Sequence, residues 1–357
     1  MIIKTRILQD MMVKAIKGAG NNKMLPITGM MLLEANSGKL SLRTTDSDNY
    51  LYLSQDIESQ DNLSVVVPVE QFSKLVSKLT SDFVELELVD GKLVVKGNGT
   101  YKIELPLDEE GNLITYPNPI AKEDLHVIDK IQLATIKSIL QHNKPCLDSL
   151  DNSCYNGYYV DEVGVLTTDT LIMCDNMVNF LNHPVLISRE MMDLLDVFTD
   201  NEVEVYENET HLVFSTPSCA VYGNKKSGIE DYQVEALRGL VREDFTNMVQ
   251  LSSYRFINAL DRLSLFVGKY DRNKVLLSFE PQGLKISSIN GSGVEVLEYS
   301  NKDAEVVPFN CVVDIELLSS QLKAQESATI QLWYGVDKAI KMVDGIVNQI
   351  IALDDEA

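Results

Sequence analysis

Few residues of this chain have the type and spacing that enzymatic or metal chemistry requires. The five cysteines form no CxxC pair, and the four histidines show no HExxH or similar ligand spacing. The sequence also has no GxSxG motif, no P-loop and no GxGxxG after a strand. The Asp-rich segment 46–49 lacks the Gly and the distal Glu of a calcium loop. We therefore expect no enzyme, no bound metal and no cofactor.

The cationic side chains form pairs that are spaced to share helix faces: Lys14 with Lys17, Lys74 with Lys78, and Arg255 with Arg262. The formal net charge of the chain is nevertheless −22, and acidic proteins are repelled by phosphate backbones. Charge alone thus argues against a nucleic-acid role, unless the cations are concentrated on one surface. The acidic residues do gather elsewhere, in the hairpin and loop segments 85–90, 108–110, 202–209 and 354–356.

The elements that position these cations follow a threefold repeat. Segments beginning at Val65, His183 and Glu305 each read as a short apolar strand, an amphipathic helix, an alternating strand and a hairpin partner. The first strands are predicted at 65–67, 185–187 and 305–307. A second pattern precedes each segment, in which helices at 10–17, 133–141 and 254–264 lead into a strand–turn–strand–strand motif.

The repeat period of about 120 residues lies in the usual size range of a domain. We predict an α+β chain of three repeated domains, each with two helices packed on antiparallel sheets, at residues 1–123, 124–239 and 240–357. No run of about 18 apolar residues exists, so no membrane span is predicted. Together with the scattered thiols and the absence of a signal peptide, this indicates a cytoplasmic protein.

Three long segments carry a resemblance to a known family. These are LPITGMMLLEANSGKLSLRTTD from Leu25, FINALDRLSLFVGKYDRNKVLLSFEPQGLKISS from Phe256, and VPFNCVVDIELLSSQLKA from Val307. In this order they resemble the bacterial-type beta sliding clamp, the beta subunit of DNA polymerase III, over essentially the full length. The resemblance implies a head-to-tail homodimeric ring whose helices line a hole and whose sheets form the rim.

The resemblance further implies that the ring slides on double-stranded DNA and tethers a replicative DNA polymerase. Helix cations would make replaceable phosphate contacts, and the acidic exterior would repel DNA from the other surface. The expected DNA-facing residues are Lys14, Lys17, Lys23, Lys74, Lys78, Lys137, Lys144, Arg189, Arg255, Arg262 and Lys323. Family loop contacts map onto Asn22, Ser149, Ser153 and Cys154, where the family's aromatic pair is missing.

Family members bind short peptides of polymerases, of the clamp loader and of other clamp-binding-motif proteins in an apolar groove. The matching positions are Tyr155, Thr168, Thr170, Ile172, Met173, Ile229, Glu230, Val234, Ala339, Met342, Ile350, Ile351, Ala352 and Leu353. Thr170-Leu171-Ile172 replaces the family's Gly-His-Arg, and an acidic tail replaces its last residues. Ordinary strand core is an equal alternative for Ile172, Met173, Ile350 and Ile351. The departures favour a divergent clamp, encoded on a phage or plasmid, with its own partners.

The resemblance places the subunit interface between the first and third domains. The expected residues are Phe266 and Val267, an edge strand with Tyr101, Ile103, Leu105 and Leu107, and the cations Lys269, Arg272 and Lys274 opposite the acidic residues 108–110. A surface loop with ordinary charges is the alternative for the charged part. The competing function is a non-encircling clamp paralogue that acts as a decoy or protective variant for clamp-binding proteins.

Overall fold

The computed structural model of the protein describes residues 1–108, 110–121, 124–268, 273–301 and 305–354. Throughout these residues the paired strands run antiparallel, and short helices pack on the sheets. The predicted α+β class is confirmed. None of the described helices is long and apolar enough to cross a membrane.

Contacts divide the chain into two compact units. Unit 1 comprises Met1–Ile136 with Glu190–Lys225, and unit 2 comprises Lys137–Arg189 with Lys226–Ala357. Two elements extend across the division, α3 (Leu133–Asn143) and α4 (Arg189–Leu194). The three predicted domains follow the sequence repeat and not these two units. Their boundaries stay a prediction.

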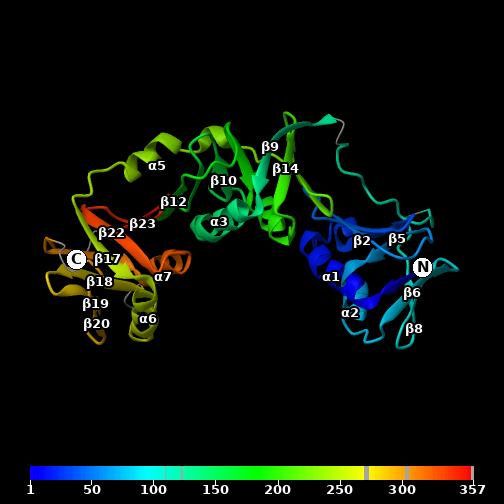
Figure 1. The fold of residues 1–357 in the computed structure, drawn as a ribbon, viewed down its shortest axis with the longest axis horizontal. Coiled ribbons are helices and arrows are strands. Elements are labelled where there is room, and N and C mark those ends of the chain that lie inside the picture. Colours follow the sequence, from blue (N-terminus) through cyan, green and yellow to red (C-terminus); the bar gives the residue numbers. More distant parts are fainter. Residues whose placement is uncertain (109, 122–123, 269–272, 302–304, 355–357) are drawn as a thin grey trace. The chain divides into compact units, whose positions relative to one another are not determined.

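Unit 1 holds one sheet of eight strands and one of four (Figure 1). The larger has the order β5 (Leu63–Pro68), β2 (Met30–Asn36), β3 (Lys39–Thr45), β4 (Asn49–Asp56), β16 (Cys219–Asn224), β15 (His211–Ser215), β14 (Glu202–Glu207), β9 (His126–Gln132). The smaller has the order β1 (Ile2–Lys4), β6 (Phe83–Val89), β7 (Lys92–Lys96), β8 (Thr100–Glu104). Its helical elements are α1 (Thr5–Ala15), η1 (Ile16–Gly18), η2 (Pro26–Gly29), α2 (Val69–Val76) and η5 (Leu195–Val197).

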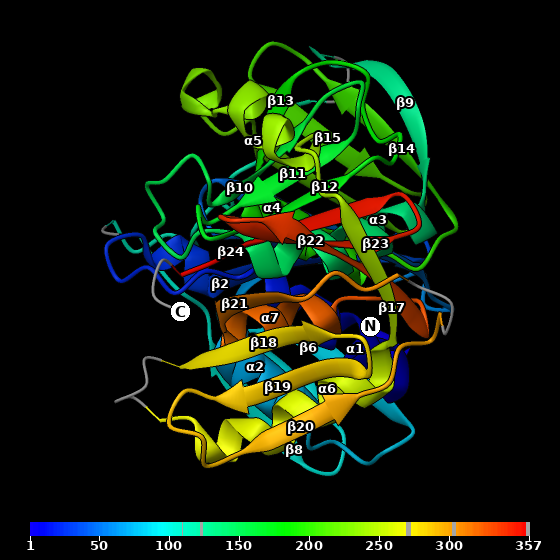
Figure 2. The ribbon, with the colours of Figure 1, turned by 90° about the vertical axis from the view of Figure 1, so that its left-hand side faces the viewer.

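Unit 2 repeats this plan. Its larger sheet has the order β13 (Val185–Ser188), β10 (Gly157–Val160), β11 (Val165–Thr168), β12 (Ile172–Asn176), β24 (Val347–Ala352), β23 (Ala339–Asp344), β22 (Thr329–Val336), β17 (Asn247–Ser252). The smaller, in the foreground of Figure 2, has the order β20 (Val294–Leu297), β19 (Gly283–Ser288), β18 (Lys274–Glu280), β21 (Phe309–Asp314). Its helical elements are η4 (Lys144–Cys146), η6 (Ile229–Asp231), α5 (Val234–Val241), α6 (Ser253–Leu263), η7 (Ser264–Phe266) and α7 (Ile315–Lys323).

The residue pattern explains why these segments adopt these elements. In α1, Leu8, Met11, Met12 and Ala15 recur at helical spacing and form the buried stripe. β2 alternates between buried and half-buried residues, as a strand with one core face does. β10, β11 and β12 are buried at every position, because both faces of this part of the sheet are covered.

Two of the predicted elements were misplaced. The strand predicted at 305–307 is wrong, because β21 pairs with β18 only from Phe309 to Asp314, after Pro308, which has no backbone N–H. Val313 lies in that strand. α7 begins at Ile315, because the Asp314 carboxylate accepts hydrogen bonds from the Glu316 and Leu317 amides at 2.7 and 3.1 Å. The helix predicted at 10–17 begins earlier, at Thr5.

The same Thr-Thr-Asp turn closes one hairpin in each unit. The Thr45 and Thr168 hydroxyls, both buried, donate to the Asn49 and Ile172 carbonyls at 2.6 and 2.7 Å. The residue after the aspartate has positive φ in both turns, 98° at Ser47 and 80° at Thr170. Positive φ is unfavourable for a β-branched residue, so Thr170 is the more strained of the two.

We predict that Thr170→Gly stabilises unit 2 by about 1 kcal/mol, because glycine adopts this conformation without steric cost. The midpoint of urea unfolding, followed by the fluorescence of the single tryptophan, measures the change. Thr170→Ala, which removes the branch but keeps the Cβ, should give a smaller gain. Equal midpoints for the threonine and glycine proteins would contradict the assignment of strain.

Candidate functional site

The predicted DNA-facing cations lie on helices or at helix ends, except Lys23, which is in the turn before η2. In unit 1, α1 and α2 pack against each other, so that their cations belong to one helical layer (Figure 1). Lys17, Lys23, Lys74, Lys78, Lys137, Lys144, Arg255, Arg262 and Lys323 are exposed, whereas Lys14 and Arg189 are half-buried.

Several of these cations have carboxylate partners on or near the same helices. Lys17 pairs with Asp196 at 2.9 Å, and Lys323 pairs with Asp261 at 3.0 Å. Lys74 pairs with Glu70 one helical turn away. The Arg262 guanidinium donates two hydrogen bonds to Glu295, at 2.7 and 2.9 Å, which raises the arginine pKa. The helical surface is therefore less basic than the cations alone indicate, because acids from the helices contribute to it as well.

The predicted groove residues separate onto the two faces of the larger sheet of unit 2. One face is covered by α5, and we call it the outer face. On it, Met173 and Ile350 lie opposite each other on β12 and β24, and both are only 3% exposed. Tyr155, Ile229 and Val234 pack against them. These five residues form one apolar cluster, which we call the outer cluster; its other members are Cys154, Tyr159, Leu166, Leu186, Tyr232, Leu237, Val241, Phe245, Trp333, Val336 and Ala339.

The remaining apolar groove residues lie elsewhere. Ile172, Met342 and Ile351 are buried in the core beneath α6 and α7, and Leu353 packs against that core. Successive residues of a strand point to opposite faces, so Ile172 and Ile351 cannot share a face with Met173 and Ile350. Ile172, Met342 and Ile351 are thus core residues in this structure and Leu353 is half-buried; a groove role for these four stays a prediction. Thr168 is buried and serves the turn, whereas Thr170 is exposed.

A buried ion pair that the sequence did not reveal fastens α5 to the outer cluster. Arg238 of α5 is 5% exposed and donates to both carboxylate oxygens of Asp161, at 2.6 and 2.9 Å. Its Nε lies 3.5 Å from Asp175, which is also buried. The amphipathic spacing of Val234, Leu237 and Val241 was the only sequence signal for this helix.

The pKa values of the two carboxyl groups are shifted in opposite directions. Burial alone would raise the pKa of Asp161, but the Arg238 hydrogen bonds and the Val163 and Gly164 amides hold it below its ordinary value. Burial raises the pKa of Asp175 above its ordinary value, and Arg238 only partly offsets this. Lys341 donates to the Val241 carbonyl at 3.2 Å and lies over the rings of Phe245 and Trp333; its burial lowers its pKa.

The predicted subunit interface has an edge strand, as expected, since β8 ends its four-stranded sheet. Ile103 and Leu105 do not offer side chains there, because both are buried in unit 1, whereas Leu107 is exposed. Phe266 is 51% exposed and Val267 is half-buried. Lys274 pairs with Asp354 at 2.7 Å rather than with the acidic residues 108–110. Lys269 and Arg272 lie outside the described residues.

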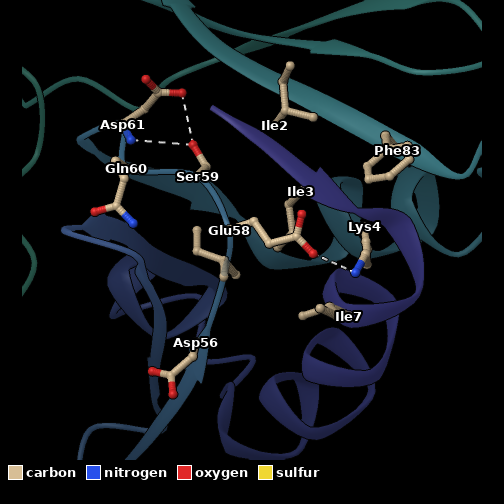
Figure 3. Close-up of a pocket in the computed structure, with 11 residues that line it drawn as sticks. Ile2, Ile3, Lys4, Ile7, Asp56, Glu58, Ser59, Gln60, Asp61 and Phe83 are labelled. Atoms are coloured by element: carbon tan, nitrogen blue, oxygen red, sulfur yellow. Dashed lines mark hydrogen bonds and ion pairs between the residues drawn. The ribbon is translucent and has the colours of Figure 1, made fainter.

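A cavity of about 650 Å³ in unit 1 contains none of the predicted residues (Figure 3). Ile2, Ile7 and Phe83 form its apolar side, and its polar rim belongs to the segment between β4 and β5. Lys4 pairs with Glu58 at 2.7 Å across the opening, which neutralises one of the three carboxylates in the lining, those of Asp56, Glu58 and Asp61. Nothing in this lining is arranged for catalysis.

Comparison with known proteins shows which family the chain resembles. The family model described as the DNA polymerase III beta subunit, N-terminal domain, matches residues 1–113. The beta sliding clamp of Bacillus subtilis (strain 168) is 22% identical over 369 residues, covering 92% of each sequence. The chain is thus similar to the beta sliding clamps, at low identity, over most of its length. The predicted resemblance is confirmed.

Solved structures of the family share the fold of the whole chain. The sliding clamp of Bacillus subtilis has a TM-score of 0.84 at 20% identity, and the DNA polymerase III beta subunit of Thermotoga maritima has 0.83 at 17%. The DNA polymerase III subunit beta of Borrelia burgdorferi has 0.85 at 14%. Each comparison covers 100% of this chain and 99% of the other.

We predict opposite results for two isosteric substitutions beside Arg238. Asp161→Asn should destabilise unit 2 by about 2 kcal/mol at pH 7, because it removes a charge-assisted pair. Since the folded-state pKa of Asp161 is lowered, this stabilisation exists above its ordinary value of 3.8 and disappears as the pH falls through the folded-state pKa. The deficit should therefore shrink in acid.

Asp175→Asn should cost less than Asp161→Asn at pH 7 or be stabilising. The raised pKa of Asp175 means that its stabilising contribution is complete at low pH and is lost as the pH rises through that pKa. Urea unfolding of both variants at pH 7 and at about pH 3, below the ordinary carboxyl pKa of 3.8, checks the pair of predictions. Equal losses at both pH values would contradict the assigned directions of the two pKa shifts.

Proposed function

We propose that this protein is a DNA polymerase processivity factor, a non-enzymatic homodimeric ring that encircles duplex DNA and slides without sequence preference. Its partners on this proposal are a replicative polymerase, a clamp loader and other proteins with clamp-binding segments. Similarity to the beta sliding clamp family and agreement of the fold over the whole chain support it. The observation that carries it is that β8 and β20, each at the end of a four-stranded sheet, lack the junction partner that the corresponding strands of the repeat have inside the chain.

The strand order indicates what covers these two edges. β4 pairs with β16 in unit 1, and β12 pairs with β24 in unit 2. By their positions in the repeat, β20 corresponds to β4 and β12, and β8 corresponds to β16 and β24. The missing third junction is therefore β20 with β8. In a dimer, β20 of each copy would pair with β8 of the other. Each of these junctions would join two four-stranded sheets into one of eight strands, and the two junctions together would close a head-to-tail dimer.

The internal junctions also fix the register of the proposed one. Tyr52 faces Ala220 in unit 1, and Asp175 faces Asn348 in unit 2. In the hairpins, Val294 occupies the position of Tyr52 and Asp175, because it pairs with Ser287 as they pair with Arg43 and Leu166; each of these three partners directly precedes a buried hydroxyl residue (Ser288, Thr44 and Thr167). The β7–β8 ladder places Thr100 at the position of Ala220 and Asn348, because it pairs with Lys96 as they pair with Ser215 and Val343. Thr100 of one copy should thus face Val294 of the other.

The charge distribution suits a sliding contact. Cations on separate helices, several already paired with carboxylates, would make phosphate contacts that are weak and independent of sequence. Weak contacts alone would not keep an acidic protein on DNA. Retention would come from closure of the ring, so that each phosphate contact can break and re-form during sliding.

We expect Thr100→Cys combined with Val294→Cys to form intersubunit disulfides on oxidation, because directly opposed antiparallel residues lie within disulfide range. Lys102→Cys combined with Val294→Cys is the matched control, since diagonal neighbours are about 7–8 Å apart. Electrophoresis without reductant should show a covalent dimer for the first pair alone. Equal yields from the two pairs, or none from either, would overturn the register.

The same variant tests encirclement without a loader. Reduced protein is mixed with nicked circular plasmid, oxidised and washed in high salt. Circular DNA should retain the cross-linked dimer, and linearisation should release it, because the link is topological. A non-encircling decoy paralogue would be retained on neither DNA. Retention on linear DNA after the wash would instead indicate ordinary binding and contradict the ring.

Phe266→Asp should give monomers, because Phe266 is half exposed and its side chain lies beside Gly293, directly before β20. Size-exclusion chromatography with light scattering should give about twice the chain mass of 39.9 kDa for the parent and 39.9 kDa for the variant. Tyr254→Asp, at an exposed aromatic residue at the start of α6, is the control and should remain dimeric. A dimeric Phe266→Asp protein would exclude this residue from the interface.

A further inference from the structure

α5 stands outside the repeat that generates the rest of the chain. In the described residues, each third of the element order contains eight strands and two α-helices that recur at the same places: α1 and α2, then α3 and α4, then α6 and α7. α5 falls between the second and third sets, and the described part of the corresponding connection, between β8 and β9, contains no α-helix. The sheet architecture therefore does not require it.

α5 covers the outer face of the junction between β12 and β24. It contacts both strands, and Val234, Leu237 and Val241 pack on the outer cluster. The opposite face of the same strands already packs beneath α6 and α7. Met173 and Ile350 are thus only 3% exposed because α5 and its flanking Tyr232 and Phe245 lie over them.

The attachment of α5 is strong at two points and weak elsewhere. Arg238 binds Asp161, and Lys341 binds the last carbonyl of the helix, that of Val241. The helix itself has only eight residues, includes Gly239, and receives no side-chain cap at its start. A helix this short is not stable alone, so its order depends on the docking contacts.

We infer that the face beneath α5 is a binding surface for an apolar segment that carries a cationic side chain, and that α5 is its resident occupant. The inference rests on the proposed function, in which partner peptides bind this part of the fold. An incoming segment must fill the space left by Val234 and Leu237. It must also pair with Asp161 and Asp175, since two adjacent carboxylates without Arg238 would repel each other.

The affinity of such a partner depends on how often α5 leaves. If the open state is a small fraction of molecules, the observed dissociation constant is the intrinsic one divided by that fraction. Weakening the attachment of α5 should therefore tighten binding of a partner segment. If α5 were a fixed wall of the site, weakening it would loosen binding instead.

The probe is a fluorescein-labelled peptide with the sequence of residues 229–245, which is α5 with its flanks. Arg238→Gln in the full chain should bind this peptide at least tenfold more tightly than the parent does, as measured by anisotropy. Arg242→Gln, at an exposed arginine at the end of the same helix, is the matched control and should bind like the parent. Replacing the arginine of the peptide that corresponds to Arg238 should abolish the gain.

Trp333 gives a readout that needs no peptide, because it is the single tryptophan and packs in the outer cluster. Its emission should shift to the red in Arg238→Gln but not in Arg242→Gln. Leu237→Ser should act in the same direction without leaving a carboxylate unpaired. Hydrogen exchange should show the α5 amides opening while those of β12 and β24 stay protected.

A disulfide can hold the cover closed. A Cβ built on Gly228 lies 3.6 Å from that of Cys154, within disulfide range, although the positive φ of Gly228 opposes the substitution. The double variant Gly228→Cys, Arg238→Gln should lose peptide binding when oxidised and regain it on reduction. Adding Cys154→Ser should remove the redox dependence.

Two results would overturn the inference. One is that Arg238→Gln and Leu237→Ser open β12 and β24 together with α5, which would make α5 part of the core. The other is that neither variant gains peptide affinity or shifts the Trp333 emission. Both results are independent of the cross-linking and DNA-retention outcomes, so failure of the ring proposal and failure of this one are distinguishable.

Discussion

The fold depends on one constraint: a strand at the end of a sheet exposes backbone N–H and C=O groups that need partners. Two junctions, β4 with β16 and β12 with β24, meet this need inside the chain and turn four half-sheets into two sheets of eight strands. Two half-sheets remain with open edges at β8 and β20. One chain thus carries the two complementary halves of a junction that it already contains twice, and the proposed closed dimer would use both.

The two faces of the larger sheet of unit 2 are covered by different helices. In unit 2 the strands are buried on both faces, so apolar side chains stand on both, and each face needs a cover. α6 and α7 cover one face as part of the repeat. The other receives α5, held by an arginine that pairs with two buried carboxylates. A buried arginine pair is specific in geometry but adds little net stability, which suits a cover that must be placed correctly and still be removable.

Periodicity in the sequence was sufficient for the helices and most strands, because amphipathic helices and alternating strands record which face is buried. It failed where this record is missing. β12 is apolar at successive positions, so nothing in the sequence distinguishes Met173 on the outer face from Ile172 in the core. Arg238 reads as an exposed residue of a short helix, because its partners Asp161 and Asp175 are more than sixty positions away in the sequence.

The covering of the outer face by α5 also limits which cationic segments can bind to this acidic protein. An open apolar groove on a soluble protein is a site for unspecific association, and a net charge of −22 would favour cationic amphipathic segments of many kinds. With α5 in place, a segment must supply both the apolar fit and a cation at the position of Arg238 before it gains from displacing the helix. The requirement for both raises selectivity at the expense of affinity, because part of every partner's binding free energy is used to undock α5.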